Sequence, residues 1–311
     1  MIRAAVALAA AGAIMPAMAS DFSTRVDALW NFSDPAASEA RFRAERANYS
    51  PSSREALEID TQIARALGLQ RRFDAAHATL DSVSPGLAAV DPRVRVRYLL
   101  ERGRAYNSSG VPDKAVPLFS EAATRGTDAG RPDDEYYIVD ALHMLGIAAP
   151  PAERLSFNLK ALAAADAATD ARARNWRGSL LHNIGWTYFD AGDYATALGY
   201  WQRALAFREA AGDVQRTRVA KWTVARGLRA LGRLAEAEAM QRSLADELAA
   251  AGETDGFVFE ELAEIELARG NPAAAAPWAA KAWAALKDDR NLAANEPARL
   301  ARLAALGNMP R

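Results

Sequence analysis

Apolar residues between positions 181 and 204 follow the period of an α-helix, with one interruption. From Leu181 to Tyr188 the apolar positions recur at intervals of three and four residues, and Asp190 to Asp193 has the composition of a turn. The same spacing then resumes through Tyr194, Ala197, Trp201 and Ala204. The segment therefore predicts a helical hairpin, with Trp201 in the core between its helices.

The hairpin pattern recurs along the chain. The clearest second copy has the same spacing of glycine, aromatic and small residues: Leu99, Gly103, Tyr106, Gly110, Ala115, Phe119 and Ala122. Weaker copies begin near Leu57, Glu135, Arg218 and Gly256, which gives six units in all. We expect the turn between paired helices to use a left-handed glycine at Gly110, Gly192, Gly232 and Gly270, whereas Arg71 and Ala149 stand there in the first and third units.

Small residues stand where the two helices of each unit would cross. In the fourth unit they are Gly185 and Ala197, and small residues allow the helix axes to approach closely. The third unit departs from this pattern, because Leu142 and Arg154 take the two crossing positions.

These residues resemble the tetratricopeptide repeat (TPR), in the variety with longer units of about 40 residues, since successive turn positions are 38 to 43 residues apart. The resemblance implies an all-α fold, a right-handed superhelical solenoid of about six hairpins with helical caps. We expect an N-terminal cap over residues 20–50, a repeat domain over 51–295 and a C-terminal capping helix and tail over 296–311. Asn295 would precede this last helix as its N-cap.

The first nineteen residues have the pattern of a secretory signal peptide. Arg3 precedes an uncharged stretch from Ala4 to Met15, and Pro16 is followed by Ala17, Met18 and Ala19. Cleavage after Ala19 would place the mature chain in the periplasm or outside the cell. A cytosolic repeat adaptor with a misread leader is the alternative. The rest of the chain contains no apolar run of membrane-spanning length.

The family binds its partners on the inner wall formed by the first helix of each unit, so the resemblance points to side chains on that wall. The predicted partner-binding residues are Arg65, Arg104, Asn107, His143, His182, Trp186, Phe189, Trp222, Arg226 and Arg229. Arginine binds carboxylates with paired donors, and tryptophan offers a flat surface for stacking. We therefore expect a basic and aromatic groove for a protein or peptide partner, such as an acidic or C-terminal segment, with an acidic patch at Glu260 and Glu264.

The lysine and asparagine arrangement by which some family members hold a terminal carboxylate does not carry over. Asn183 fits one of its positions, but the lysines are missing. A simpler interpretation is that the arginines only keep an alanine-rich solenoid soluble through weak surface ion pairs.

The amino-acid composition argues against several classes of partner and of catalytic site. With 38 basic and 39 acidic residues the formal net charge is -1, which argues against nucleic acid as a partner. The absence of cysteine excludes thiol nucleophiles and cysteine-based zinc sites, and the three histidines form no metal or catalytic motif. We expect neither a cofactor nor catalysis. The alternative is an envelope glycan-binding or glycan-processing enzyme on a repeat scaffold, with Trp186 and Trp222 as sugar-stacking surfaces and Glu260 and Glu264 as a carboxylate pair.

Overall fold

The computed structural model describes residues 22–88, 91–128 and 134–309, and this part of the chain is built from helices with no strand. The predicted signal peptide lies outside the described residues. The chain divides into two compact units, residues 1–109 (unit 1) and 110–311 (unit 2). The two helices of the predicted second hairpin, on either side of Gly110, belong to different units.

Unit 1 contains five α-helices and one short 3-10 helix among its described residues. Helix α3 packs against α2, α4 and α5, and a core of Val26, Phe42, Ile59 and Leu80 lies between them. Their bounds are α1 Phe22–Asp27, α2 Pro35–Arg46, α3 Arg54–Leu69, α4 Phe73–Val83, η1 Ser84–Gly86 and α5 Pro92–Ser108.

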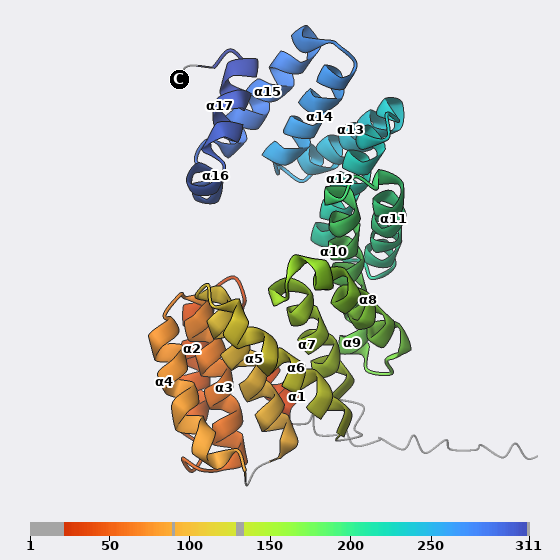
Figure 1. Ribbon diagram of the computed structural model, residues 1–311. Helices are drawn as coiled ribbons and strands as arrows, with labels where there is room; N and C mark the ends of the chain where they lie inside the picture. The colour runs from red at the N-terminus through yellow and green to blue at the C-terminus, as the bar shows by residue number, and fades with distance from the viewer. Residues whose placement is uncertain (1–21, 89–90, 129–133, 310–311) are drawn as a thin grey trace, which may run out of the picture. The chain divides into compact units, whose positions relative to one another are not determined.

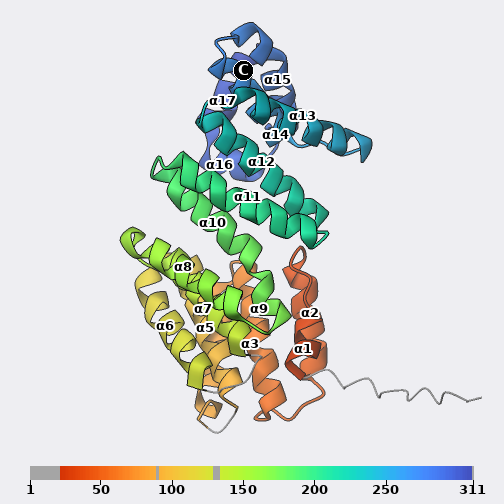
Figure 2. The same cartoon turned by 90° about the vertical axis from the view of Figure 1, so that its right-hand side faces the viewer.

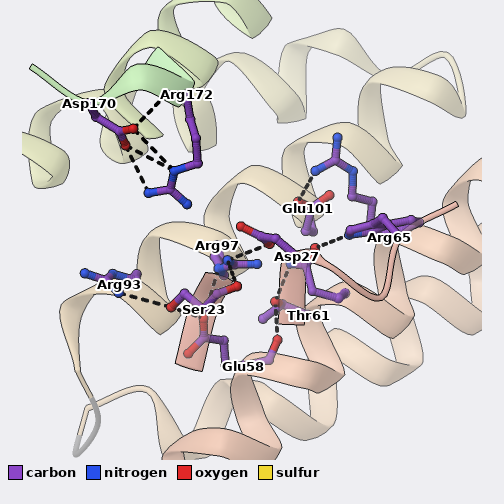
Figure 3. A network of polar contacts seen from close by, with 12 residues as sticks. Ser23, Asp27, Glu58, Thr61, Arg65, Arg93, Arg97, Glu101, Asp170 and Arg172 are labelled. Carbon is purple, nitrogen blue, oxygen red and sulfur yellow. Dashed lines mark hydrogen bonds and ion pairs between the residues drawn. The ribbon is translucent and has the colours of Figure 1, made fainter. Parts of the chain in front are cut away.

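Helix α1 is attached to unit 1 by a buried polar network as well as by apolar packing. Ser23 Oγ donates to Glu58 Oε1 at 2.5 Å, and Arg97 is ion-paired both to Glu58 (3.2 Å) and to Asp27 (2.8 Å). Figure 3 shows Arg97 beside these three side chains, which come from α1 and α3. A carboxylate as fully buried as Glu58 needs such partners, because an unpaired charge in the interior is costly.

Unit 2 is a row of helical hairpins in which each helix packs on the next. The pairs α10–α11, α12–α13 and α14–α15 are hairpins, α11 packs on α12, α13 packs on α14, and α17 covers α15 at the C-terminal end (Figures 1 and 2). The bounds are α6 Pro112–Asp128, α7 Asp134–Ala148, α8 Pro151–Ala167, α9 Ala171–Asn175, α10 Arg177–Asp190, α11 Tyr194–Ala210, α12 Val214–Ala230, α13 Leu234–Ala250, α14 Gly256–Ala268, α15 Pro272–Leu286, α16 Arg290–Asn295 and α17 Pro297–Leu306.

The turn chemistry matches the sequence pattern. Gly110, Gly192, Gly232 and Gly270 all have positive φ, between 73° and 84°. Arg71, which replaces glycine in the first unit, adopts the same left-handed region with φ 60°. One cap prediction is wrong: the N-cap of α17 is Glu296, and Asn295 is the last residue of α16.

The close crossing of α10 and α11 depends on Gly185. A methyl group on Gly185 would overlap with the indole of Trp201, which is fully buried and donates from Nε1 to the His182 carbonyl at 3.1 Å. The prediction that Trp201 is a core residue is therefore confirmed.

The predicted register of the third hairpin is wrong by one helical turn. Gly146, rather than Leu142, approaches the partner helix, and a methyl group there would overlap with the side chain of Asn158 rather than with that of Arg154. Asn158 is buried, whereas Arg154 is exposed and donates from Nε to the Ala149 carbonyl at 2.8 Å. Helix α8 thus has one more turn before the crossing than the repeat pattern predicts, so the crossing residues lie four positions later in the sequence.

Candidate functional site

One face of unit 2 gathers most of the predicted partner-binding residues. Helix α10 provides His182, Trp186 and Phe189, and α12 provides Trp222, Arg226 and Arg229. The rings of Trp186 and Trp222 have centroids 6.3 Å apart, and Trp186 also lies 5.5 Å from Phe189. Side chains on two successive first helices thus form one aromatic cluster, as the repeat pattern predicts.

This cluster borders a cavity of about 390 Å³, which we call the aromatic pocket. Its lining residues are Trp186, Val219, Trp222, Arg226, Asp255, Phe257 and Arg299. Three aromatic rings and two guanidinium groups therefore surround one space between α10, α12, the start of α14 and α17. Trp222 is held in place by a hydrogen bond from its Nε1 to the Phe257 carbonyl at 3.0 Å.

Arg226 is one of the two cations that line the pocket. Its guanidinium carbon lies 5.4 to 5.5 Å from the ring centroids of Trp186, Phe189 and Trp222, within the range of cation–π attraction. Its ion-pair partner, Glu261, is 3.6 Å away. The buried Nε of Arg226 has no hydrogen-bond partner in the described residues.

Sequence reasoning missed Glu261, which partly neutralises this basic face. Its side chain is 1% exposed and also accepts hydrogen bonds from Arg229. Burial opposes the charge of Arg229, but the hydrogen bond and charge of Glu261 outweigh that effect and raise the pKa of Arg229.

Unit 1 contains a related pairing between an arginine and a glutamate one repeat later, so a sequence signal for it existed. Glu101 is buried and pairs with Arg104 at 2.6 Å and with Arg65 at 3.7 Å. Arg65 also lies over the rings of Trp30 and Phe32. In each unit a buried glutamate pairs with an arginine of the preceding first helix, Glu101 with Arg65 and Glu261 with Arg226.

The other four predicted partner-binding residues do not lie on this face of α10 and α12. Arg65, Arg104 and Asn107 belong to unit 1, on α3 and α5. His143 on α7 is buried and its ring lies 4.7 Å from that of Trp176, so it does not join the aromatic pocket. In the register set by Gly146, His143 is equivalent to His182 rather than to Trp186.

The predicted acidic patch is not a free negative surface. Arg299 of α17 donates to Glu260 at 2.6 Å, which raises the pKa of the arginine, and Arg302 of α17 donates to Glu264. The sequence missed this pairing because the partners come from a separate capping helix. The carboxylate pair required by the glycan-processing alternative is therefore engaged with arginines.

His182 on α10 is held as a neutral imidazole and is not part of the aromatic pocket's lining. Trp186 Nε1 donates to His182 Nε2 at 3.0 Å, so that nitrogen carries no proton and the other one does. Burial, together with the positive charge of Arg208, lowers the pKa of His182 below its ordinary value of 6.5. Arg216 of α12 lines a separate cavity together with His182 and Arg208.

We predict a pH-dependent stability from this group. Because the folded state binds the proton less readily than the unfolded chain, stability falls as the pH drops below about 6.5. Replacing His182 by asparagine should remove this contribution, so the loss of Tm between pH 7.5 and 5.5 should be smaller than in the wild type. Thermal unfolding at both pH values measures the difference, and an equal loss in both proteins would contradict the assignment.

The described residues contain neither a candidate metal site nor a candidate membrane span. No group of three or more His, Asp or Glu side chains in these ranges is placed to hold a metal ion. None of the helices in the described part combines the length and the hydropathy needed to cross a bilayer.

Comparisons with known proteins agree with this architecture. Residues 178–211, which hold α10 and α11, match a family model described as tetratricopeptide repeat. A search of curated proteins finds no significant match. The helices and their repeat pattern define an all-α repeat solenoid, as predicted. Residues 178–211 thus have the tetratricopeptide repeat pattern, within a chain that has the fold of a helical-repeat solenoid.

Solved structures with the same fold come from several kinds of protein. A signal transduction ATPase with a tetratricopeptide repeat sensor, from Pyrococcus horikoshii, aligns with a TM-score of 0.66 at 14% identity, over 86% of this chain and 41% of that one. PilW, a type IV pilus biogenesis factor, aligns with a TM-score of 0.54 at 21% identity, over 78% of this chain and 99% of its own. NprR in complex with its cognate peptide NprX aligns with a TM-score of 0.52 at 16% identity, over 92% of this chain and 82% of NprR.

The present chain thus spans less than half the length of the Pyrococcus ATPase. These likenesses concern the fold alone.

Proposed function

We propose that this protein is a non-catalytic scaffold that binds a peptide segment of a partner protein on the face of α10, α12 and α14. The aromatic pocket is the observation that carries the proposal. A pocket of this size accommodates one or two side chains, and tryptophan and arginine are the residue types that dominate protein-binding energetics.

The chemistry of the pocket indicates the kind of segment it would bind. Trp186, Trp222 and Phe257 provide apolar contact area for an aromatic or aliphatic side chain. Arg226, with its donors incompletely paired, can donate to a carboxylate or a backbone carbonyl of the same segment. An apolar anchor next to an acidic residue is therefore the expected ligand pattern.

The peptide complex of NprR supports the proposal by fold, because it is a structurally similar helical-repeat chain whose structure contains a bound peptide. The arginine pairing of Glu260 and Glu264 further favours binding over acid–base catalysis, since a proton donor must be free to release and recover its proton.

Selection from a displayed library of random twelve-residue peptides tests the proposal. We expect selected peptides to combine an apolar anchor with Asp or Glu and to bind the wild type at least tenfold more tightly than either W222A or R226Q. The matched control is R203Q, which removes an exposed arginine from α11. Equal affinity for the wild type and both pocket variants, each with wild-type helical content, would contradict this site.

We also propose that the protein is exported, on the basis of the leader pattern in residues 1–19. A fusion of residues 1–25 to a reporter that is active only after export should give activity, and replacing the apolar stretch by polar residues should abolish it. An inactive fusion would favour the cytosolic adaptor.

A further inference from the structure

A second cavity in unit 2, of about 200 Å³, lies between α10, α11 and α12. Its polar lining comes from Ser179, His182, Asn183, Arg208 and Arg216, and its apolar lining comes from Ala204, Val219 and Ala220. We call it the Arg208 cavity. Val219 lines both cavities, but no arginine is shared between them.

Arg208 is a buried cation with little compensation. The residue is 5% exposed, and within the described residues its one hydrogen bond is donated from Nη2 to the neutral Ser179 hydroxyl at 3.0 Å. The nearest carboxylate oxygen, on Asp213, is 4.0 Å from Nη1. Burying a charge without a close opposite charge is unfavourable, so an anion bound beside Arg208 would stabilise the folded protein.

Asp213 is already engaged elsewhere. Its Oδ1 accepts from the Arg216 backbone N–H at 3.1 Å and caps α12, and its Oδ2 pairs with the Arg216 guanidinium at 2.9 Å. Two guanidinium groups therefore face one carboxylate. Because His182 adds no charge, the two guanidinium groups outweigh the one carboxylate and the cavity is net positive.

Other inward-facing arginines of unit 2 are paired more closely. Arg218 contacts Glu247 and Glu253 at 2.9 and 2.8 Å, and Arg299 contacts Glu260 at 2.6 Å. These carboxylates raise the pKa of Arg218 and of Arg299. Burial and the neighbouring Arg216 instead lower the pKa of Arg208. The missing partner of Arg208 is a negative charge.

The backbone of α10 is also shaped to this guanidinium. A methyl group at Gly178 would overlap with the Arg208 side chain, so only glycine lets the guanidinium lie against the start of α10. Gly178, Ser179, Arg208 and Arg216 all line the cavity, so a ligand inside it would lie against the guanidinium group of Arg208.

We propose that the Arg208 cavity binds an organic carboxylate on a short apolar stem, such as a glutamate side chain or a chain terminus of a partner. The guanidinium groups of Arg208 and Arg216 would hold the carboxylate, and Ala204, Val219 and Ala220 would contact the stem. The apolar half of the lining favours such a group over inorganic phosphate. The proposal does not depend on the aromatic pocket, since its charges are separate.

NMR titration of the full chain with butyrate tests the site. The imidazole resonances of His182, assigned by their loss in H182N, should shift in a saturable way, and the pKa of His182 should rise once an anion offsets the neighbouring charge. Butyramide, with the same stem and no charge, should produce no saturable shift. Inorganic phosphate should bind more weakly than butyrate.

Two variants make the test independent of folding defects. R208Q should weaken butyrate binding at least tenfold, and R216Q, at a side chain that is 62% exposed, should weaken it several-fold without unfolding the protein. R203Q on α11 is the control and should bind like the wild type. Equal binding by R208Q or R216Q and the wild type, or equal binding of butyramide, would overturn the site. Tighter binding of phosphate than of butyrate would overturn the assignment to a carboxylate.

Discussion

Replacing Trp201 by alanine is expected to lower the free energy of unfolding of unit 2 by about 3–5 kcal/mol, the range for removing a large aromatic side chain from a core. The indole is fully buried, and its ring centroid lies 5.1 Å from that of Trp186 and 5.3 Å from that of Phe189. It also packs against Gly185 and Gly227, whose missing side chains make room for it. Neighbouring helices cannot fill that volume without moving their backbones.

Urea unfolding followed by circular dichroism measures the loss, and W283A is the matched control. Trp283 is only partly buried, with Lys287 over its ring, so its removal should cost less than half as much. A cost below about 1 kcal/mol for W201A would show that Trp201 is not the packing centre of the α10–α13 hairpins.

Replacing Glu261 by alanine should also be strongly destabilising, by about 3 kcal/mol, because it leaves Arg226 and Arg229 facing each other without their shared carboxylate. Glu261 is 1% exposed, whereas the two arginine side chains are 27% and 21% exposed, and this partial contact with solvent moderates the effect.

The matched control for E261A is E236A. Glu236 pairs with Arg233 at 2.6 Å, but both side chains are largely exposed, so the loss should be far smaller than that of E261A. Urea unfolding of both variants gives the comparison. Equal small losses would mean that Glu261 is dispensable and that the arginines are compensated by solvent.

The hairpins of unit 2 could be predicted from sequence where small residues and turn glycines are both present. Gly185 and Gly192 set the crossing and the turn of α10 and α11, and both act in the structure as their spacing predicts. The third hairpin could not be placed in the same way, because Ala149 replaces the turn glycine and α8 has an extra turn between its start at Pro151 and Asn158, which faces Gly146 at the crossing. The sequence feature that marks the crossing of the third hairpin is Gly146, four residues after the expected position at Leu142.

The side chains of the aromatic pocket were predicted more completely than its charges. Helical periodicity places Trp186, Trp222 and Arg226 on one face, and the structure brings them together. Periodicity within a helix gives no information about Glu261 and Arg299, whose contacts depend on how α14 and α17 pack against their neighbours. The proposed partner-binding face is therefore less basic than the sequence predicts, and the last hairpin is less acidic.

The central claim is that a partner peptide binds in the aromatic pocket, and the indole N–H signals of the tryptophans test it most directly. On addition of a selected peptide, the signals of Trp186 and Trp222 should shift and broaden together, because both rings line the pocket. Those of Trp278 and Trp283, on α15, should stay in place. Shifts confined to α15, or binding that leaves Trp186 and Trp222 unchanged, would contradict the account.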